Sequence, residues 1–250
     1  MKKIFYLPFM ALVMLMSNSC STSSDDIGSH DVTENVQKVN FNSLNDGDHG
    51  MGALHNKALE LYYENNSDDG KISYADALIK MSEYMKEYDN SFFSDVDSQK
   101  LIEEYDNFKV YQNANMDANI KDGYFAETHD MLDYIKSKNE ISSNNYDFLV
   151  TKVLIDEDFE VTLNEIDNYL ANNNLSIYDR QQIETVKSIY ISSNTYWETS
   201  PHSNSSVVAK GDPKSRAVII ADAVGGLIWA STGPFAVIGA AACSLIANEA

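Results

Sequence analysis

The chain has 250 residues, of which 38 are acidic and 18 basic, so its formal net charge is −20. A field of this sign repels polyanions and no basic cluster offsets it, which predicts that nucleic acid is not a partner. With 15 tyrosines and 10 phenylalanines the chain has enough large apolar side chains for a core, which argues against global disorder.

The first residues are typical of a secretion signal. Met1-Lys2-Lys3 is short and basic, and the apolar stretch 4–16 that follows is too short for a membrane-spanning helix, which needs about 20 residues. Small polar residues then lead directly into Cys20. Residues 1–19 are therefore predicted to be a signal peptide that is removed before Cys20.

The residues on both sides of Cys20 resemble the signal of exported Bacteroidota-type lipoproteins. Ser17-Asn18-Ser19 precedes the cysteine, and Ser21-Thr22-Ser23-Ser24-Asp25-Asp26 follows it like the surface-export tract of that group. The resemblance implies a lipid on Cys20, contact with a membrane through that lipid, and a location at the outer membrane or cell surface. The alternative is an ordinary secretory signal, with Cys20 removed or left as a free thiol.

The rest of the chain divides by composition. Residues 20–46 are polar, acidic and aperiodic, which predicts a flexible tether. Residues 47–198 are predicted to form an acidic helical domain, and 199–212 a polar linker. Apolar residues recur at helical spacing within the domain, and no stretch shows the alternation of a strand. We predict an all-α, multi-helix bundle with helices over 51–64, 74–88, 101–111, 124–135, 145–155, 158–170 and 177–197, and with Ser142 and Ser176 as N-caps.

The loop between the first two predicted helices resembles an EF-hand calcium loop. Gly70 falls at the sharp-turn position, and the oxygen-ligand positions are taken by Asn65, Ser67, Asp69 and Asp76. The first position is Asn rather than Asp and the last is Asp rather than Glu, so the resemblance implies weak calcium binding at most. The alternative is a helix-turn-helix without an ion, in which Gly70 permits the bend and the protein has no cofactor.

The stretch Gly50-Met51-Gly52-Ala53-Leu54-His55-Asn56 is the most distinctive polar cluster. His55-Asn56 before a long amphipathic helix resembles a feature of uncharacterised Bacteroidota-type lipoproteins that also end in a Gly/Ala-rich apolar tail. The resemblance implies no particular activity. The alternative for His55 is a residue that is hydrogen-bonded near a helix start. The aromatic residues Tyr190, Tyr196 and Trp197 form a cluster in the sequence that is expected in the core, or else in a ligand cradle.

An apolar segment over 217–247, whose one charged residue is Asp222, ends the chain. Gly233 and Pro234 interrupt it and predict two arms, each only about 20 Å long and too short to span a bilayer unaided. Small residues at four-residue spacing let two helices approach closely. We predict that 213–250 forms an apolar helical hairpin. Its packing or membrane-contact residues are Gly225, Gly226, Trp229, Gly233, Pro234 and Gly239.

Three functions are compatible with this sequence. In the first, the chain has a binding or interaction role at the envelope, and the hairpin is a buried element or a seam for self-association through 217–247. In the second, the protein is membrane-active, with a hairpin similar in general form to those of pore-forming bacteriocins. Asp222 is costly in lipid unless it pairs or is protonated. In the third, the protein is a hydrolase that uses carboxylates which the sequence does not single out.

Overall fold

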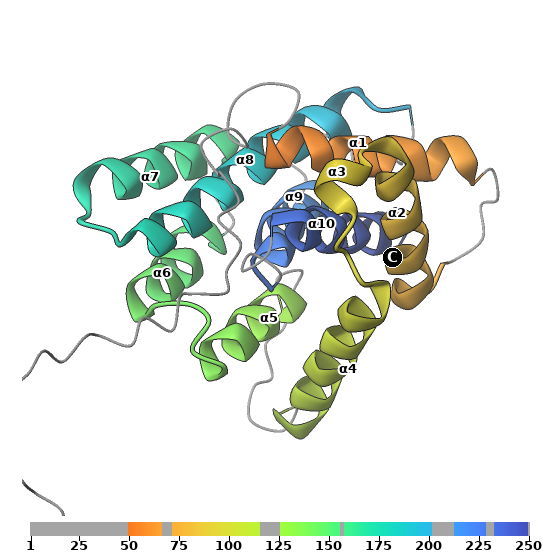
Figure 1. The fold of residues 1–250 in the computed structure, drawn as a ribbon. Helices are drawn as coiled ribbons and strands as arrows, with labels where there is room; N and C mark the ends of the chain where they lie inside the picture. Colours follow the sequence, from red (N-terminus) through yellow and green to blue (C-terminus); the bar gives the residue numbers. More distant parts are fainter. Residues whose placement is uncertain are drawn as a thin grey trace, which may run out of the picture. The chain divides into compact units, whose positions relative to one another are not determined.

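The structure is a computed structural model that describes residues 50–66, 72–115, 126–155, 158–201, 213–228 and 233–249. Within these ranges the chain forms helices and no strand (Figure 1). The predicted all-α, multi-helix fold is therefore confirmed. The helices are α1 (Met51–Asn65), α2 (Tyr74–Tyr88), α3 (Asn90–Phe93), α4 (Ser98–Asn115), α5 (Ala126–Ser137), α6 (Ser143–Phe148), the π-helix η3 (Leu149–Val153), α7 (Phe159–Asn172), α8 (Ile177–Thr199), α9 (Pro213–Ile228) and α10 (Gly233–Glu249).

Serine side chains begin three of the helices. Ser142 accepts a hydrogen bond from the Asn145 backbone N–H, and Ser176 accepts one from that of Asp179, so both predicted N-caps are confirmed. Ser73 does the same for α2. Each hydroxyl satisfies a backbone donor that has no partner inside its own helix.

Replacing Ser176 with alanine removes the cap of α8. We expect the free energy of unfolding to fall by about 1 kcal/mol, because an N–H of the first turn loses its acceptor. Thr195→Ala is the matched control, since the exposed Thr195 hydroxyl donates only to the Ile191 carbonyl of its own helix. Urea unfolding followed by far-UV circular dichroism measures both. Equal losses from the two variants would contradict the capping role.

Two details differ from the predicted helices. The helix predicted over 145–155 is α6 followed by the π-helix η3, in which the Leu154 N–H donates to the Leu149 carbonyl five residues earlier. The short helix α3 was not predicted, because its N-cap Asp89 directly follows α2 and its four residues are too few to show a helical period. Asp89 accepts hydrogen bonds from the backbone N–H groups of Ser91 and Phe92.

The core is centred on the two C-terminal helices. α9 and α10 contact each other, and α1, α2, α5 and α8 pack around them. Figure 1 shows the blue α9 and α10 between α1 on one side and α5 on the other. Their apolar side chains belong to the same buried cluster as Leu54 of α1, Leu78 of α2 and Ile189 of α8. The amphipathic helices therefore cover most of the apolar surface that α9 and α10 would otherwise expose to water.

Small residues let α9 and α10 approach closely. A Cβ added at Gly225 would lie 2.8 Å from Cys243 Sγ, and one added at Gly226 would lie 3.6 Å from the carbonyl oxygen of Ala236. The C-terminal part of α9 thus lies against the middle of α10. Residues 229–232 lie outside the described ranges, and the hairpin turn stays a prediction. In the part of the chain that the structure describes, no helix combines the length and apolar character needed to cross a membrane.

Other predicted features also fall outside the described residues. They are the signal peptide over 1–19, Cys20, the tether as far as residue 46, Ser67, Asp69, Trp229 and most of the linker over 199–212. Gly233 and Pro234 lie in the first turn of α10. Gly239 lies in the middle of α10, where its carbonyl oxygen accepts a hydrogen bond of 3.4 Å from the Tyr74 hydroxyl.

Candidate functional site

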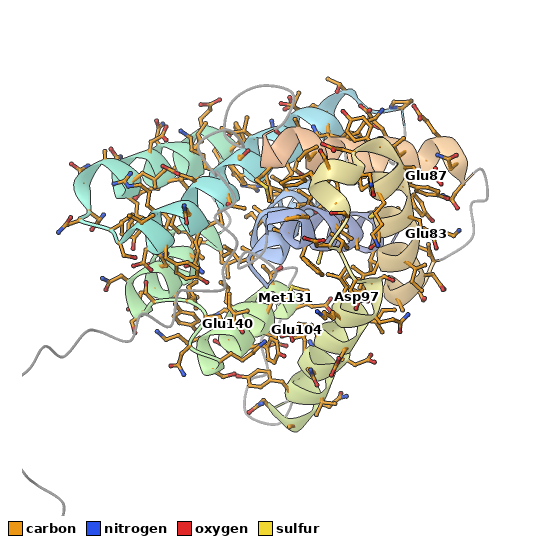
Figure 2. All side chains as sticks on the ribbon, in the orientation of Figure 1. Glu83, Glu87, Asp97, Glu104, Met131 and Glu140 are labelled. Carbon is orange, nitrogen blue, oxygen red and sulfur yellow. The ribbon has the colours of Figure 1, made fainter. Side chains whose placement is uncertain are left out.

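Most acidic side chains lie at the surface, where water solvates them. Glu83 and Glu87, for example, are exposed and project from the outer side of α2 (Figure 2). Met131 instead lies on the side of α5 that faces the core (Figure 2). Among the carboxylates that the structure describes, Asp222 is the exception, because it is completely buried. A buried carboxylate has to be neutral, paired or hydrogen-bonded, so its surroundings define the most informative site in the described chain.

The start of α1 lies directly on α8. The Gly52 N–H donates to Ser188 Oγ at 3.0 Å, and a Cβ at Gly52 would lie 2.2 Å from Ser192 Oγ and 2.3 Å from the Ser188 carbonyl oxygen. Only a glycine permits this distance between the two helices. The Gly50–Asn56 stretch that stands out in the sequence is therefore the part of α1 that crosses α8.

The close crossing places His55 and Asn56 at the interface. Asn56 Nδ2 donates to the Ser192 carbonyl oxygen at 2.9 Å, and Asn56 Oδ1 lies 3.0 Å from His55 Nδ1. The His55 side chain is 0% exposed. Burial lowers the pKa of His55 to about 4, and the hydrogen bond with Asn56 opposes that shift only in part. The imidazole is therefore neutral near neutral pH.

Asp222 on α9 receives donors from two other helices. Its Oδ2 accepts hydrogen bonds from the hydroxyl of Ser193 on α8, from Ser244 Oγ on α10 at 2.8 Å, and from Trp197 Nε1 on α8 at 3.3 Å. Trp197 Nε1 also lies 3.1 Å from Ser244 Oγ. Asp222 Oδ2 also lies 3.7 Å from His55 Nε2 on α1. Residues from four helices thus meet at one carboxyl group.

The site is buried from solvent, and this controls its charge. Burial raises the pKa of Asp222 to about 7, against the opposing effect of the hydrogen bonds from Ser193, Ser244 and Trp197. Among the described residues, Asp222 Oδ1 and His55 Nε2 have no hydrogen-bond partner. We name His55, Asn56, Ser193, Trp197, Asp222 and Ser244 the interhelical polar cluster.

The interhelical polar cluster contains the residue types of a hydrolase triad but not its arrangement. The Ser193 hydroxyl donates to Asp222 rather than to a histidine, and His55 Nδ1 faces Asn56. In a triad the serine is bonded to the histidine, which removes its proton. His55, Ser193, Asp222 and Ser244 are all fully buried, so a substrate cannot reach them in this conformation. What the cluster does in the folded chain is fix the positions of α1, α8, α9 and α10.

The predicted calcium ligands are described only in part. Asn65 ends α1 and its Nδ2 donates to the Leu61 carbonyl at 2.8 Å, while Asp76 accepts a hydrogen bond of 2.6 Å from the Ser73 hydroxyl. Ser67 and Asp69 lie outside the described residues. Within the described ranges, no group of three or more His, Cys, Asp and Glu side chains is placed to hold a metal ion. Calcium binding at this loop stays a prediction.

Sequence reasoning identified some members of the interhelical polar cluster but did not bring them together. His55-Asn56 stood out as a motif, Asp222 as a charge in an apolar helix, and Trp197 as an aromatic residue expected in the core. Ser193 and Ser244 carried no signal of their own. The one usable signal was Asp222, because a carboxylate in an apolar segment requires donors from elsewhere in the chain. No family model matches the chain, and neither the curated proteins nor the solved structures gave a match.

Proposed function

We propose that this chain is an exported, lipid-anchored protein of the cell envelope whose helical domain has a binding or interaction role. The export signal and Cys20 in the sequence support the location and the anchor. The observation that carries the role is the complete burial of His55 and Asp222. The titratable groups with the chemistry of a catalyst are used to hold helices together, which leaves the outer surface for contact with a partner.

Exposed apolar side chains mark two places on that surface. Ile177 at the start of α8 is 80% exposed, and Val110 on α4 is 68% exposed. Both are β-branched residues on helices whose other large apolar side chains are mostly covered. Such positions suit contact with another protein, because burying them on binding is favourable.

The lipid anchor is tested by labelling cells of a Bacteroidota host with an alkyne fatty acid. We expect the label on the wild-type chain and none on Cys20→Ala, because the thiol is the acceptor of the lipid. Cys243→Ala, which removes the other cysteine, should keep the label. Protease treatment of intact cells then shows whether the labelled chain reaches the surface. Equal labelling of the Cys20→Ala variant would contradict the anchor.

The interaction role is tested by photocrosslinking in cells. A photoreactive amino acid is placed at position 177 or 110, and Glu83 on the outer side of α2 provides a charged control position. We expect a discrete adduct from position 177 or 110 and none from 83. If neither apolar position gives an adduct while the chain is displayed and folded, the interaction role is wrong.

A second candidate is a membrane-active protein that acts through α9 and α10. The observation that favours it is the pKa of Asp222, which burial raises to about 7. Inside the bundle the carboxyl is therefore mostly neutral below pH 7, which reduces the charge that counted against placing α9 in lipid. The structure keeps both helices inside the bundle, so this function needs them to leave it.

Release of dye from anionic liposomes tests the second candidate. We expect leakage with the full chain, greater at pH 5 than at pH 8, because the neutral carboxyl of Asp222 enters hydrocarbon more readily. A chain that ends at Asp212 lacks α9 and α10 and is the control. Equal leakage from the two chains would assign the effect to another part of the protein.

A further inference from the structure

The hydrogen bonds of the interhelical polar cluster fix the position of one proton on His55. Asn56 Nδ2 donates to the Ser192 carbonyl, so Asn56 presents its oxygen to His55 Nδ1. An amide oxygen only accepts, and therefore Nδ1 has to carry the hydrogen. In the neutral ring Nε2 is then a bare acceptor, and it lies 3.7 Å from Asp222 Oδ2.

The charge of this buried pair depends on how many titratable protons it holds. With none, the ionised Asp222 would face the lone pair of Nε2, and the cluster would carry an unpaired negative charge. With two protons it would carry an unpaired positive charge on His55. With one proton the pair has no net charge, and the cost of burying an unpaired charge is avoided.

We propose that His55 and Asp222 hold a single titratable proton in the folded protein, carried by the Asp222 carboxyl, while His55 stays a neutral ring with its hydrogen on Nδ1. The inference concerns the buried interhelical polar cluster and goes beyond the proposed function. It assigns a task to both halves of the pair. In this state both groups are buried without a net charge.

The pKa shifts of the two groups agree with a range in which the pair holds one proton. Burial raises the pKa of Asp222 from 3.8 to about 7 and lowers that of His55 from 6.5 to about 4. Titratable groups on the other packed elements are Cys243 of α10, Tyr74 of α2, Tyr190 of α8 and Glu127 of α5. Burial raises the pKa of Cys243 and of Tyr190 to about 12, so both stay uncharged in this range.

Each group alone would make stability depend on pH, with opposite signs. For His55 the unfolded chain takes up a proton that the folded chain refuses, so stability is lost as the pH falls from 6.5 toward 4. For Asp222 the unfolded chain releases a proton that the folded chain keeps, so stability is lost as the pH rises from 3.8 toward 7. When both groups are present, the folded chain and the unfolded chain each hold one titratable proton on His55 and Asp222 between about pH 4 and 6.5. The proton moves from the histidine to the aspartate on folding, and the two dependences cancel.

Single substitutions should uncover each dependence. We expect Asp222→Asn to unfold more readily than the wild type as the pH falls from 6.5 to 4, with the unfolding equilibrium constant rising by about tenfold per pH unit relative to the wild type. For His55→Leu, the unfolding equilibrium constant relative to the wild type should rise by about tenfold per pH unit as the pH increases from 4 to 7. The measurement is urea unfolding of the full chain at several pH values. For the double variant, the unfolding equilibrium constant relative to the wild type should not change with pH.

The wild-type protein allows a test that needs no variant. Long-range ¹H–¹⁵N NMR of the histidine side chains should show His55 neutral, with its hydrogen on Nδ1, from about pH 8 down to about pH 4. Three outcomes overturn the proposal. The first is a hydrogen on Nε2 instead of Nδ1, and the second is a His55 that becomes an imidazolium near pH 6.5. The third is a pair of single variants that unfold with the same pH dependence as the wild type.

Discussion

Replacing Trp197 with alanine should reduce the free energy of unfolding by about 4 kcal/mol, the range found when large aromatic residues are removed from cores. The Trp197 side chain is among the largest that are fully buried. Its loss leaves a cavity beneath α9 and α10, and it also removes the Nε1 donor from Asp222 and Ser244. Urea unfolding followed by far-UV circular dichroism at pH 6 is the appropriate measurement.

Two further variants separate the causes of that loss. Trp197→Phe keeps an aromatic ring but has no N–H, so it should cost less than the alanine change and still weaken the hydrogen bonding of Asp222. Ile177→Ala removes a large side chain that is 80% exposed, and it should change stability by less than about 0.5 kcal/mol. A Trp197→Ala variant as stable as Ile177→Ala would show that the ring does not support the core.

The second large effect is expected for Gly52→Ala, at about 3 kcal/mol of lost stability. The added methyl group would lie 2.3 Å from the Ser188 carbonyl oxygen, which belongs to the backbone of α8 and cannot rotate away. Helix α1 would have to move away from α8, which would stretch the hydrogen bond from Asn56 to the Ser192 carbonyl. Alanine forms helices better than glycine, so Gly52→Ala should increase stability if packing does not matter at this position.

Gly226→Ala is the matched control for the Gly52 change. A Cβ there would lie 2.8 Å from Ile189 Cδ1, which is the far end of a flexible side chain and can turn aside. We expect a change of less than about 1 kcal/mol, because helix propensity offsets part of the strain. Equal destabilisation by Gly52→Ala and Gly226→Ala would mean that the α1–α8 crossing is packed no more tightly than the surroundings of Gly226. Thermal unfolding of the two variants side by side distinguishes these results.

The helices could be predicted because their signals are local. Ser142 and Ser176 precede amphipathic stretches, and Pro213 and Pro234 stand in the first turns of α9 and α10. Each of these residues acts on a backbone only a few positions away, so a window of the sequence contains the whole cause. The short helix α3 and the π-helix η3 lack such a signal.

The interhelical polar cluster could not be predicted because its contacts join distant parts of the chain. Asn56 bonds to Ser192, which lies 136 positions further on, and Ser193 bonds to Asp222 across 29 positions. Helical periodicity indicates which face of a helix is apolar but not which helix covers it. Asp222 could be recognised as a residue in need of partners, and the identity of those partners depends on the crossing of α1 with α8.

The reactivity of the Cys243 thiol can be used to measure local opening of the folded chain. Its thiol lies 3.3 Å from the Tyr74 hydroxyl between α2 and α10, and burial raises its pKa to about 12. The thiolate is the form that attacks an alkylating reagent, and the reagent needs room to approach, so the closed form is almost inert. The rate at which such a reagent modifies Cys243 therefore reports how often the helices packed around this thiol separate from α10, without any substitution.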